Sequence, residues 1–126
     1  MSIDHIRALV AKDFEVVNTL IIDKIQPHIA LIADLSNHIV QSGGKRLRPL
    51  LVLLASKACG YEGDLHIPLA AVVEFIHTAT LLHDDVLDES TLRRGKETAN
   101  TIWGNKASIL VGDFLFTQSM QLTLEV

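Results

Sequence analysis

The most informative stretch of this sequence is an acidic segment, HTATLLHDDVLDES, at residues 77–90. On a helix, which turns by about 100° per residue, Asp84 and Asp88 lie one turn apart on the same face, and Asp85 lies beside them. Carboxylates at this spacing repel each other unless a cation lies between them. Hard divalent ions such as Mg²⁺ take oxygen ligands and share them with substrate phosphates. The segment therefore predicts a site for Mg²⁺ and a diphosphate; the alternative is a solvated acidic helix end.

Two features of the preceding residues favour the metal site. Residues 69–82 are strongly apolar, so the carboxylates lie at the end of a buried helix. His77 lies almost in line with Asp84 and Asp88, two turns earlier, and we predict that it contacts the same anionic ligand. The alternative for His77 is a core histidine with satisfied hydrogen bonds.

Four of the five arginines lie in two short clusters, although the chain as a whole is acidic. The first cluster, GGKRLRP at residues 43–49, places Lys45, Arg46 and Arg48 between glycines and the start of a helix. Glycine allows the backbone to approach a ligand closely, and the helix dipole favours an anion there. These side chains are suited to phosphate, so the cluster predicts a small, highly anionic ligand. A solvated basic turn is the alternative.

The second cluster, Arg93 and Arg94, follows Asp88 by five and six residues. It lies close in sequence to carboxylates that would otherwise carry uncompensated charge. Its position is compatible with the same anionic ligand, and equally with a structural salt bridge to Asp85 or Glu89.

Helical periodicity extends over the whole chain, and no strand-like alternation is visible. We expect five helices. The first three span residues 3–27, 28–42 and 48–58, and the second and third stop at Gly43-Gly44 and Gly60. The fourth runs from residue 65 to 88 or 89, and the fifth from residue 99 or 105 to the end. Asp64 is the expected cap of the fourth helix, and residues 89–100 are an expected loop. The third helix is apolar nearly all round, so we expect it to be buried, and Cys59 with it. The predicted fold class is all-α, in one domain over residues 1–126.

Composition excludes several classes of protein. Apolar residues make up 48% of the 126, which is typical of a chain with a core, and the single cysteine fits a reducing cytoplasm. The net charge of −4 argues against nucleic acid and anionic membranes as general partners. No signal peptide is visible, and the longest uncharged run, residues 114–124, has 11 residues, too few to span a membrane. The final QSMQLTLEV has no helix-stop signal, so we expect the fold to be truncated there.

The ordered set GGKRLRP, FIHTATLLHDDVLDES, LRRG and VGDFLF resembles the trans-isoprenyl (polyprenyl) diphosphate synthases, and most closely their long-chain bacterial members. The resemblance covers roughly residues 41–120. It implies the N-terminal helices of an isoprenoid-synthase-type bundle. It also implies that isopentenyl diphosphate is added to an allylic diphosphate, such as farnesyl diphosphate, to give an octaprenyl-like trans product.

The resemblance also implies roles for individual residues. The diphosphate of isopentenyl diphosphate would be held by Lys45, Arg48, His77 and Arg94. Asp84 and Asp88, with Asp85 nearby, would bind Mg²⁺ that bridges to the allylic diphosphate, which Arg93 would contact directly. Mg²⁺ and these bases would neutralise the leaving diphosphate, so that the allylic bond can ionise. Arg46 receives no primary role.

Product length is implied to depend on the same helix. Ile76 and Thr80 lie beside the metal-binding face, and Ala79 lies further round. In this family a bulky aromatic before the first aspartates blocks the growing tail. Ala79 and Thr80 are small, which favours an open channel and a long product.

The family's second aspartate-rich motif and a later lysine do not occur in this sequence. We therefore expect the chain to be inactive alone, and to form a homodimer through the region from residue 105. One alternative is a truncated, non-catalytic partner that binds diphosphates or regulates another subunit. A class I terpene cyclase shares the DDxxD pattern but does not need GGKRLRP or RRG. A helical bundle whose charges are all structural is the remaining alternative.

Overall fold

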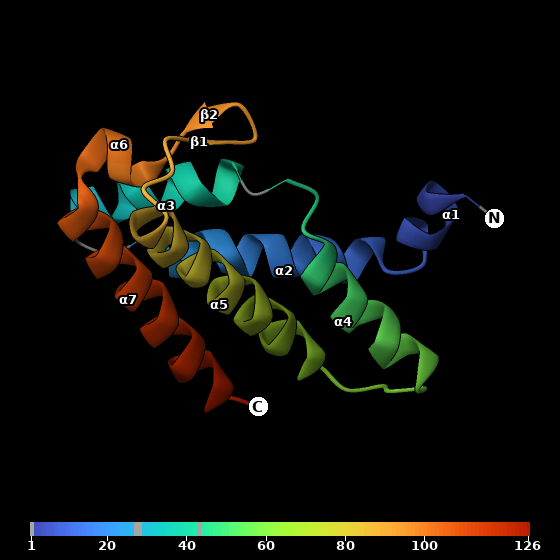
Figure 1. Ribbon diagram of the computed structural model, residues 1–126. Helices are drawn as coiled ribbons and strands as arrows, with labels where there is room; N and C mark the ends of the chain where they lie inside the picture. Colours follow the sequence, from blue (N-terminus) through green and yellow to red (C-terminus); the bar gives the residue numbers. More distant parts are fainter. Residues whose placement is uncertain (1, 27–28, 43) are drawn as a thin grey trace.

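The computed structural model describes residues 2–26, 29–42 and 44–126. The chain forms the helices and hairpin shown in Figure 1: α1 (Ile3–Ala8), α2 (Ala11–Lys24), α3 (Ala30–Ser42), α4 (Leu47–Ala58), α5 (His66–Leu87), β1 (Leu92–Arg93), β2 (Lys96–Glu97), α6 (Ala99–Trp103) and α7 (Asn105–Thr123). The all-α prediction is confirmed. In the part of the chain that the structure describes, no helix combines the length and apolarity needed to cross a membrane.

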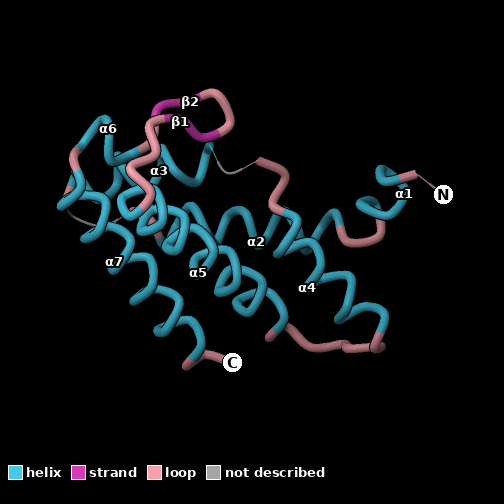
Figure 2. Tube along the Cα trace, in the orientation of Figure 1, coloured by secondary structure: helices cyan, strands magenta, loops and turns pink. Residues whose placement is uncertain are grey.

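Helix α5 is the central element of the fold. It packs against α2, α3, α4, α6 and α7, and the tube view shows α7 running alongside it (Figure 2). Its core positions include Val72, Phe75, Ala79 and Leu82, none more than 5% exposed. The expected buried helix is thus confirmed, and its observed end at Leu87, with Asp88 as the C-cap, is within two residues of the prediction.

Helices α4 and α5 end with the same backbone motif. After α4, Gly60 takes a left-handed conformation, and the amides of Gly60 and Tyr61 donate to the carbonyls of Lys57 and Ser56. This is a Schellman motif, in which glycine is the usual left-handed residue, so the stop predicted at Gly60 is confirmed. After α5 the left-handed residue is Glu89, at φ +54°.

The single helix expected at residues 3–27 is wrong. The chain breaks at Leu9 and Val10, and Val10 leaves helical geometry (φ −126°, ψ 17°) while it is only 5% exposed. Burial of Val10 in the core therefore overrides local helix propensity. Helix α2 ends at Lys24; the boundary expected at Pro27 and His28, like the stop expected at Gly43, lies outside the described residues.

The expectations for α4 and its flanks also need correction. Only Pro49, Leu50 and Leu53 are buried in α4, and Leu51 is 62% exposed, because the helix packs on one side only, against α2 and α5. Cys59, expected to be buried, is exposed, since it is the C-cap where the chain turns away from the helix. Asp64 does not cap α5; Leu65 is the N-cap, without a side-chain hydrogen bond.

The segment after α5 is more ordered than a loop. β1 and β2 form a two-stranded antiparallel hairpin, and its turn residues Arg94 and Gly95 both have positive φ. Strands of two residues are too short to show an alternating pattern. The last predicted helix is divided into α6 and α7 by Gly104, at φ +92°, and α7 ends at Thr123 instead of continuing to Val126.

Candidate functional site

Most of the predicted phosphate-binding side chains line one cavity. This basic cavity, of about 260 Å³, is lined by residues of the α4 N-terminus, of α5 and of the hairpin: Lys45, Arg46, Leu47, Arg48, Glu74, His77 and Arg94. An adjoining hollow of about 190 Å³ shares Arg48, His77 and Arg94 with it and adds Arg93. The structure therefore brings together Lys45, Arg48, His77 and Arg94, which lie up to 49 residues apart in the chain.

Gly44 lets the hairpin reach the turn before α4. A Cβ atom at residue 44 would lie 2.6 Å from Nη1 of Arg94, and the residue has φ +78°. Only glycine suits both conditions. The glycines of this turn were expected to let the backbone approach a ligand closely; in the structure, the group that approaches Gly44 is the Arg94 guanidinium.

His77 is a cavity residue instead of a core residue. Its Nε2 accepts a hydrogen bond from Nη1 of Arg48, at 3.2 Å. A guanidinium can only donate, so the accepting Nε2 is unprotonated. Burial, and then the positive charges of Arg48, Arg93 and Arg94, lower the pKa of His77. His77 is therefore neutral at pH 7 before an anion enters.

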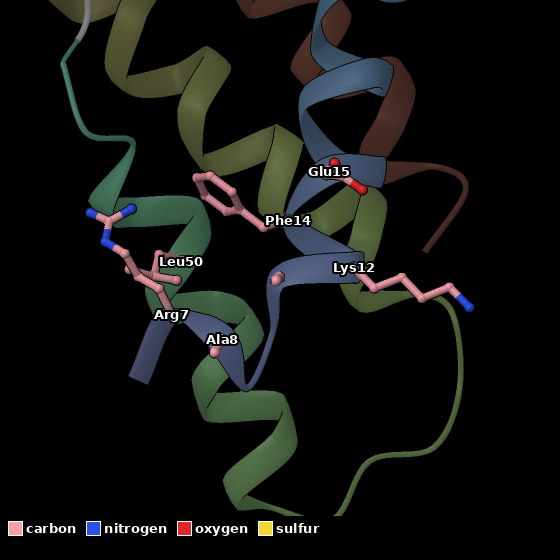
Figure 3. A pocket seen from close by; sticks show the side chains of 7 residues that line it. Arg7, Ala8, Lys12, Phe14, Glu15 and Leu50 are labelled. Carbon is pink, nitrogen blue, oxygen red and sulfur yellow. The ribbon is translucent and has the colours of Figure 1, made fainter. Parts of the chain in front are cut away.

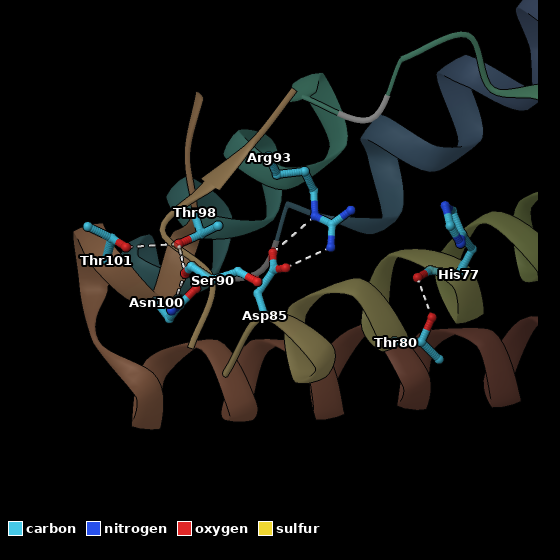
Figure 4. Close-up of polar contacts among 8 residues, drawn as sticks. All are labelled: His77, Thr80, Asp85, Ser90, Arg93, Thr98, Asn100 and Thr101. Carbon is cyan, nitrogen blue, oxygen red and sulfur yellow. Dashed lines mark hydrogen bonds and ion pairs between the residues drawn. The ribbon is translucent and has the colours of Figure 1, made fainter. Parts of the chain in front are cut away.

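The three aspartates of the acidic segment have different environments. Asp84 and Asp88 are exposed, and the Asp88 amide donates to the Asp84 carbonyl at 2.8 Å. Asp85 is only 2% exposed. It accepts two hydrogen bonds from Arg93, at 3.1 Å from Nε and 2.6 Å from Nη2 (Figure 4). The salt-bridge alternative considered for the second basic cluster is thus present at Arg93.

This contact fixes the charge and direction of Arg93. The hydrogen bond to Asp85 raises the pKa of Arg93. Burial opposes this rise, whereas the negative charges of Asp85, Asp84 and Asp88 add to it. A bidentate pair orients the planar guanidinium as well as holding it. Arg93 therefore stays close to the exposed aspartates.

Asp84 and Asp88 fit a divalent metal ion that is shared with a phosphate ligand. Within residues 2–26, 29–42 and 44–126, no group of three or more His, Cys, Asp or Glu side chains converges as a complete metal site. Mg²⁺, however, is commonly bound by one or two carboxylates, with water and substrate phosphates as its other ligands. The two exposed aspartates match that donor set, whereas Asp85 is engaged by Arg93.

A hydrogen-bond network holds the hairpin in place. The Ser90 carbonyl accepts from Thr98 Oγ1 at 2.8 Å and from Asn100 Nδ2 at 3.0 Å, and Thr98 also contacts Thr101 (Figure 4). These bonds join the two ends of the segment that carries Arg93 and Arg94. The sequence analysis did not predict these hydrogen bonds, although the polar residues on both sides of RRG could have indicated them.

Sequence reasoning also missed Glu74 and Asn18. Glu74 lines the basic cavity from α5 while only 6% exposed. Asn18, on α2, accepts a hydrogen bond from Nη1 of Arg46. The available signal for Glu74 was a single acidic residue within the apolar run LAAVVEFIHTA.

The three candidate chain-length residues do not share one surface. Ile76 is 39% exposed and Thr80 is exposed, whereas Ala79 is 2% exposed and belongs to the core. Of the three, only Ile76 and Thr80 are exposed. Thr80 also donates to the His77 carbonyl at 2.7 Å (Figure 4).

Another hollow, of about 490 Å³, lies between α1, α2 and α4 (Figure 3). Its charged lining residues, Arg7, Lys12 and Glu15, carry both signs, and the remainder of its lining is apolar. It lacks the convergence of positive charge found in the basic cavity. The candidate site is therefore the basic cavity together with the exposed aspartates.

Comparison with known proteins agrees with this helical architecture. The fold is that of the isoprenoid synthases. One match is a crystal structure of polyprenyl synthase from Caulobacter crescentus CB15, complexed with calcium and isoprenyl diphosphate. The TM-score is 0.94 and the sequence identity 51%, and the match covers 98% of this chain and 38% of the Caulobacter chain. A decaprenyl diphosphate synthase from Rhodobacter capsulatus matches with a TM-score of 0.91 and 50% sequence identity. This match covers 97% of this chain and 38% of the Rhodobacter chain.

The sequence comparisons define the family. The family model described as polyprenyl synthetase matches residues 29–126. The octaprenyl diphosphate synthase of Escherichia coli (strain K12) is 52% identical over 122 residues, which are 97% of this chain and 38% of the relative. The chain belongs to the polyprenyl synthetase family, and it spans about 38% of the length of the curated relatives it matches first.

Proposed function

We propose that this chain supplies the first substrate-binding part of a prenyltransferase that adds isopentenyl diphosphate to an allylic diphosphate and makes a long trans-polyprenyl diphosphate. The observation that carries this proposal is the convergence of Lys45, Arg48, His77 and Arg94 on one cavity. His77 lies on α5, the helix that also carries the exposed Asp84 and has Asp88 as its C-cap. The names of the similar proteins, octaprenyl diphosphate synthase and a polyprenyl synthase complexed with isoprenyl diphosphate, support this choice of substrate.

In this proposal the basic cavity holds the diphosphate of isopentenyl diphosphate. Lys45, Arg48 and Arg94 donate charge-assisted hydrogen bonds to its oxygens. His77, whose pKa is lowered by burial and then by the positive charges of the neighbouring arginines, lines the same cavity and accepts a hydrogen bond from Arg48.

The allylic diphosphate lies at the end of α5. Asp84 and Asp88 would hold Mg²⁺, and Asp85 orients Arg93 towards the same diphosphate. Bound Mg²⁺ supplies positive charge that stabilises the departing diphosphate. Arg93 adds a fixed positive charge at the same place, and because its direction is set in advance, it needs no reorganisation during the reaction.

In the same proposal, product length depends on α5. Ile76 and Thr80, beside the aspartates, border the path of the growing chain.

A homodimer contact is assigned to α7. Its exposed face carries Ile109, Phe116 and Met120. We place the protein in the cytoplasm, where its single cysteine remains reduced. It forms the N-terminal part of a single all-α domain.

A chimeric enzyme tests the catalytic proposal. The matching segment of the Escherichia coli octaprenyl diphosphate synthase is replaced by this chain, and the chimera is incubated with labelled isopentenyl diphosphate, farnesyl diphosphate and Mg²⁺. We expect elongated products that are lost in Asp84→Ala and retained in Asp23→Ala, an exposed aspartate on α2. A folded chimera that binds diphosphate without elongating it would contradict catalysis and favour the non-catalytic alternative.

A further inference from the structure

Glu74 is a negative charge in a cavity built for anions. It lines the basic cavity together with Lys45, Arg46, Arg48 and Arg94, yet its side chain is nearly inaccessible, at 6% exposure. Within the described part of the chain, Glu74 forms no ion pair. Burying an unpaired carboxylate is costly, and its charge repels an incoming anion. Its presence therefore needs a separate explanation.

The charges that act on Glu74 come from the turn before α4. Burial raises the pKa of Glu74, and the positive fields of Arg46 and Arg48 oppose that rise in part. These two arginines belong to the turn at residues 44–48, whereas Glu74 belongs to α5. The carboxylate is therefore electrostatically coupled to the segment that carries the predicted phosphate ligands.

Arg46 differs from the basic residues on either side of it. It has a left-handed backbone (φ +51°) and is half-buried, and its guanidinium donates to Asn18 on α2. Lys45 and Arg48 are exposed. A left-handed conformation is unfavourable for arginine. The Arg46 carbonyl accepts a hydrogen bond from the Leu50 amide, and its side chain donates to Asn18, so both contacts support this conformation.

We propose that Asn18 and Glu74 are positioning residues for Arg46: Asn18 acts through its hydrogen bond, and Glu74 acts through its charge in the shared cavity. Together they keep Arg46 between α2 and α5 and thereby fix the turn at residues 44–48, so that Lys45 and Arg48 are directed at a bound diphosphate. The inference rests on the proposed function, because it assigns the basic cavity to a diphosphate. It gives Arg46, for which the resemblance implied no role, a task distinct from ligand contact.

The direction in which one substitution changes anion affinity distinguishes this positioning role from simple electrostatic repulsion. Glu74→Gln removes a negative charge and leaves the side-chain shape nearly unchanged. If Glu74 only added repulsion, the variant would bind an anion more tightly. If Glu74 holds Arg46 in place, the variant would bind the anion more weakly, because the turn loses its fixed geometry.

The experiment is titration calorimetry of the chain with inorganic diphosphate in the presence of Mg²⁺. We expect Glu74→Gln and Asn18→Ala each to weaken binding by about fivefold to tenfold, as is typical of the loss of a coupled contact. In an Arg46→Ala background, Glu74→Gln should have no further effect, because it acts through Arg46. Glu62→Gln, the same change at an exposed loop position beyond the other end of α4, is the matched control and should bind as the parent does.

Arg48→Ala separates the possible failures. If it weakens binding while Glu74→Gln binds equally well or more tightly, the positioning role is overturned and the diphosphate cavity stands. If the parent does not bind, or Arg48→Ala has no effect, the proposed diphosphate cavity is overturned, and the positioning role with it. Thermal melts of each variant establish folding, and Asn18→Ala provides a second test, on a different helix, should Glu74→Gln not fold.

Discussion

At the scale of single residues, Glu74 and Asp85 are two carboxylates buried on the same helix in opposite circumstances. Asp85 is paired by both of its oxygens with Arg93. Glu74 shares a cavity with several cations, but none of the described ones pairs with it. Removing one partner of the first arrangement would destabilise the fold, whereas the second arrangement, a buried carboxylate without an ion pair, itself costs stability.

The cost of Glu74 depends on pH in a defined direction. Its pKa is raised above the ordinary value of 4.5, so the folded state holds the proton at pH values where the unfolded state releases it. The resulting loss of stability is absent below pH 4.5 and develops as pH rises through the folded-state pKa. Glu74→Gln should therefore melt about 2–5 °C higher than the parent at pH 7.5 and equally at pH 4. A lower melting temperature at pH 7.5 would show that the carboxylate is stabilising.

The Asp85–Arg93 pair predicts the opposite effect. Asp85→Asn leaves the Arg93 guanidinium without its partner, and because the Arg93 side chain is 31% exposed, water compensates in part. We expect a loss of about 1–3 kcal/mol in the free energy of unfolding, below the value typical of fully buried pairs. Asp84→Asn, one residue earlier and exposed, should change stability by less than about 0.5 kcal/mol. Urea denaturation of the two variants measures the difference, and equal losses would contradict the assignment.

At the scale of elements, the end of α5 carries the acidic segment and a strained residue together. Glu89 occupies the left-handed position of the Schellman motif, where α4 has Gly60. Glu89→Gly should raise the unfolding free energy by about 0.5–1 kcal/mol, because the cost of left-handed geometry exceeds the extra flexibility of glycine. Gly60→Ala should lower it by about 1 kcal/mol. Urea midpoints that move in the same direction for both variants would contradict this reading.

The sequence predicted best those elements in which the hydrophobic periodicity and the residues that start or stop a helix indicate the same boundaries. Helix α5 is long and apolar, and α4 ends at a glycine, so both were located within two residues. The break at Val10 was not visible, because it depends on burial of Val10 in the core. The hairpin was missed because its turn is Arg94-Gly95, an unusual pair for such a turn, and its strands are two residues long.

For the candidate site, the sequence identified the bases that line the cavity better than the residues that support them. Lys45, Arg48, His77 and Arg94 were proposed from residue type and order, and the structure gathers them. The contacts Arg46–Asn18 and Arg93–Asp85 join residues whose proximity, or whose choice of partner, depends on packing. Residue type alone left Asp85 open to both a metal and a salt bridge.

At the scale of the whole molecule, apolar side chains remain uncovered on α7. Ile109, Phe116 and Met120 are 41%, 48% and 56% exposed, and their spacing places them on one face. We expect sedimentation velocity to show concentration-dependent self-association that Phe116→Lys weakens at least tenfold, because it places a charge in the proposed dimer contact. Leu51→Lys, at an exposed leucine of α4, is the control. An equal effect of the two substitutions would indicate non-specific association.

Helix α5 also sets a distance that substitutions cannot alter. His77 and Asp84 are seven residues apart on one uninterrupted helix, an axial separation of about 10.5 Å. That separation changes only in steps of one residue, each of which adds about 1.5 Å and rotates the aspartates by about 100° away from the His77 face. An alanine inserted after Thr80 would thus leave both groups of side chains intact but out of register.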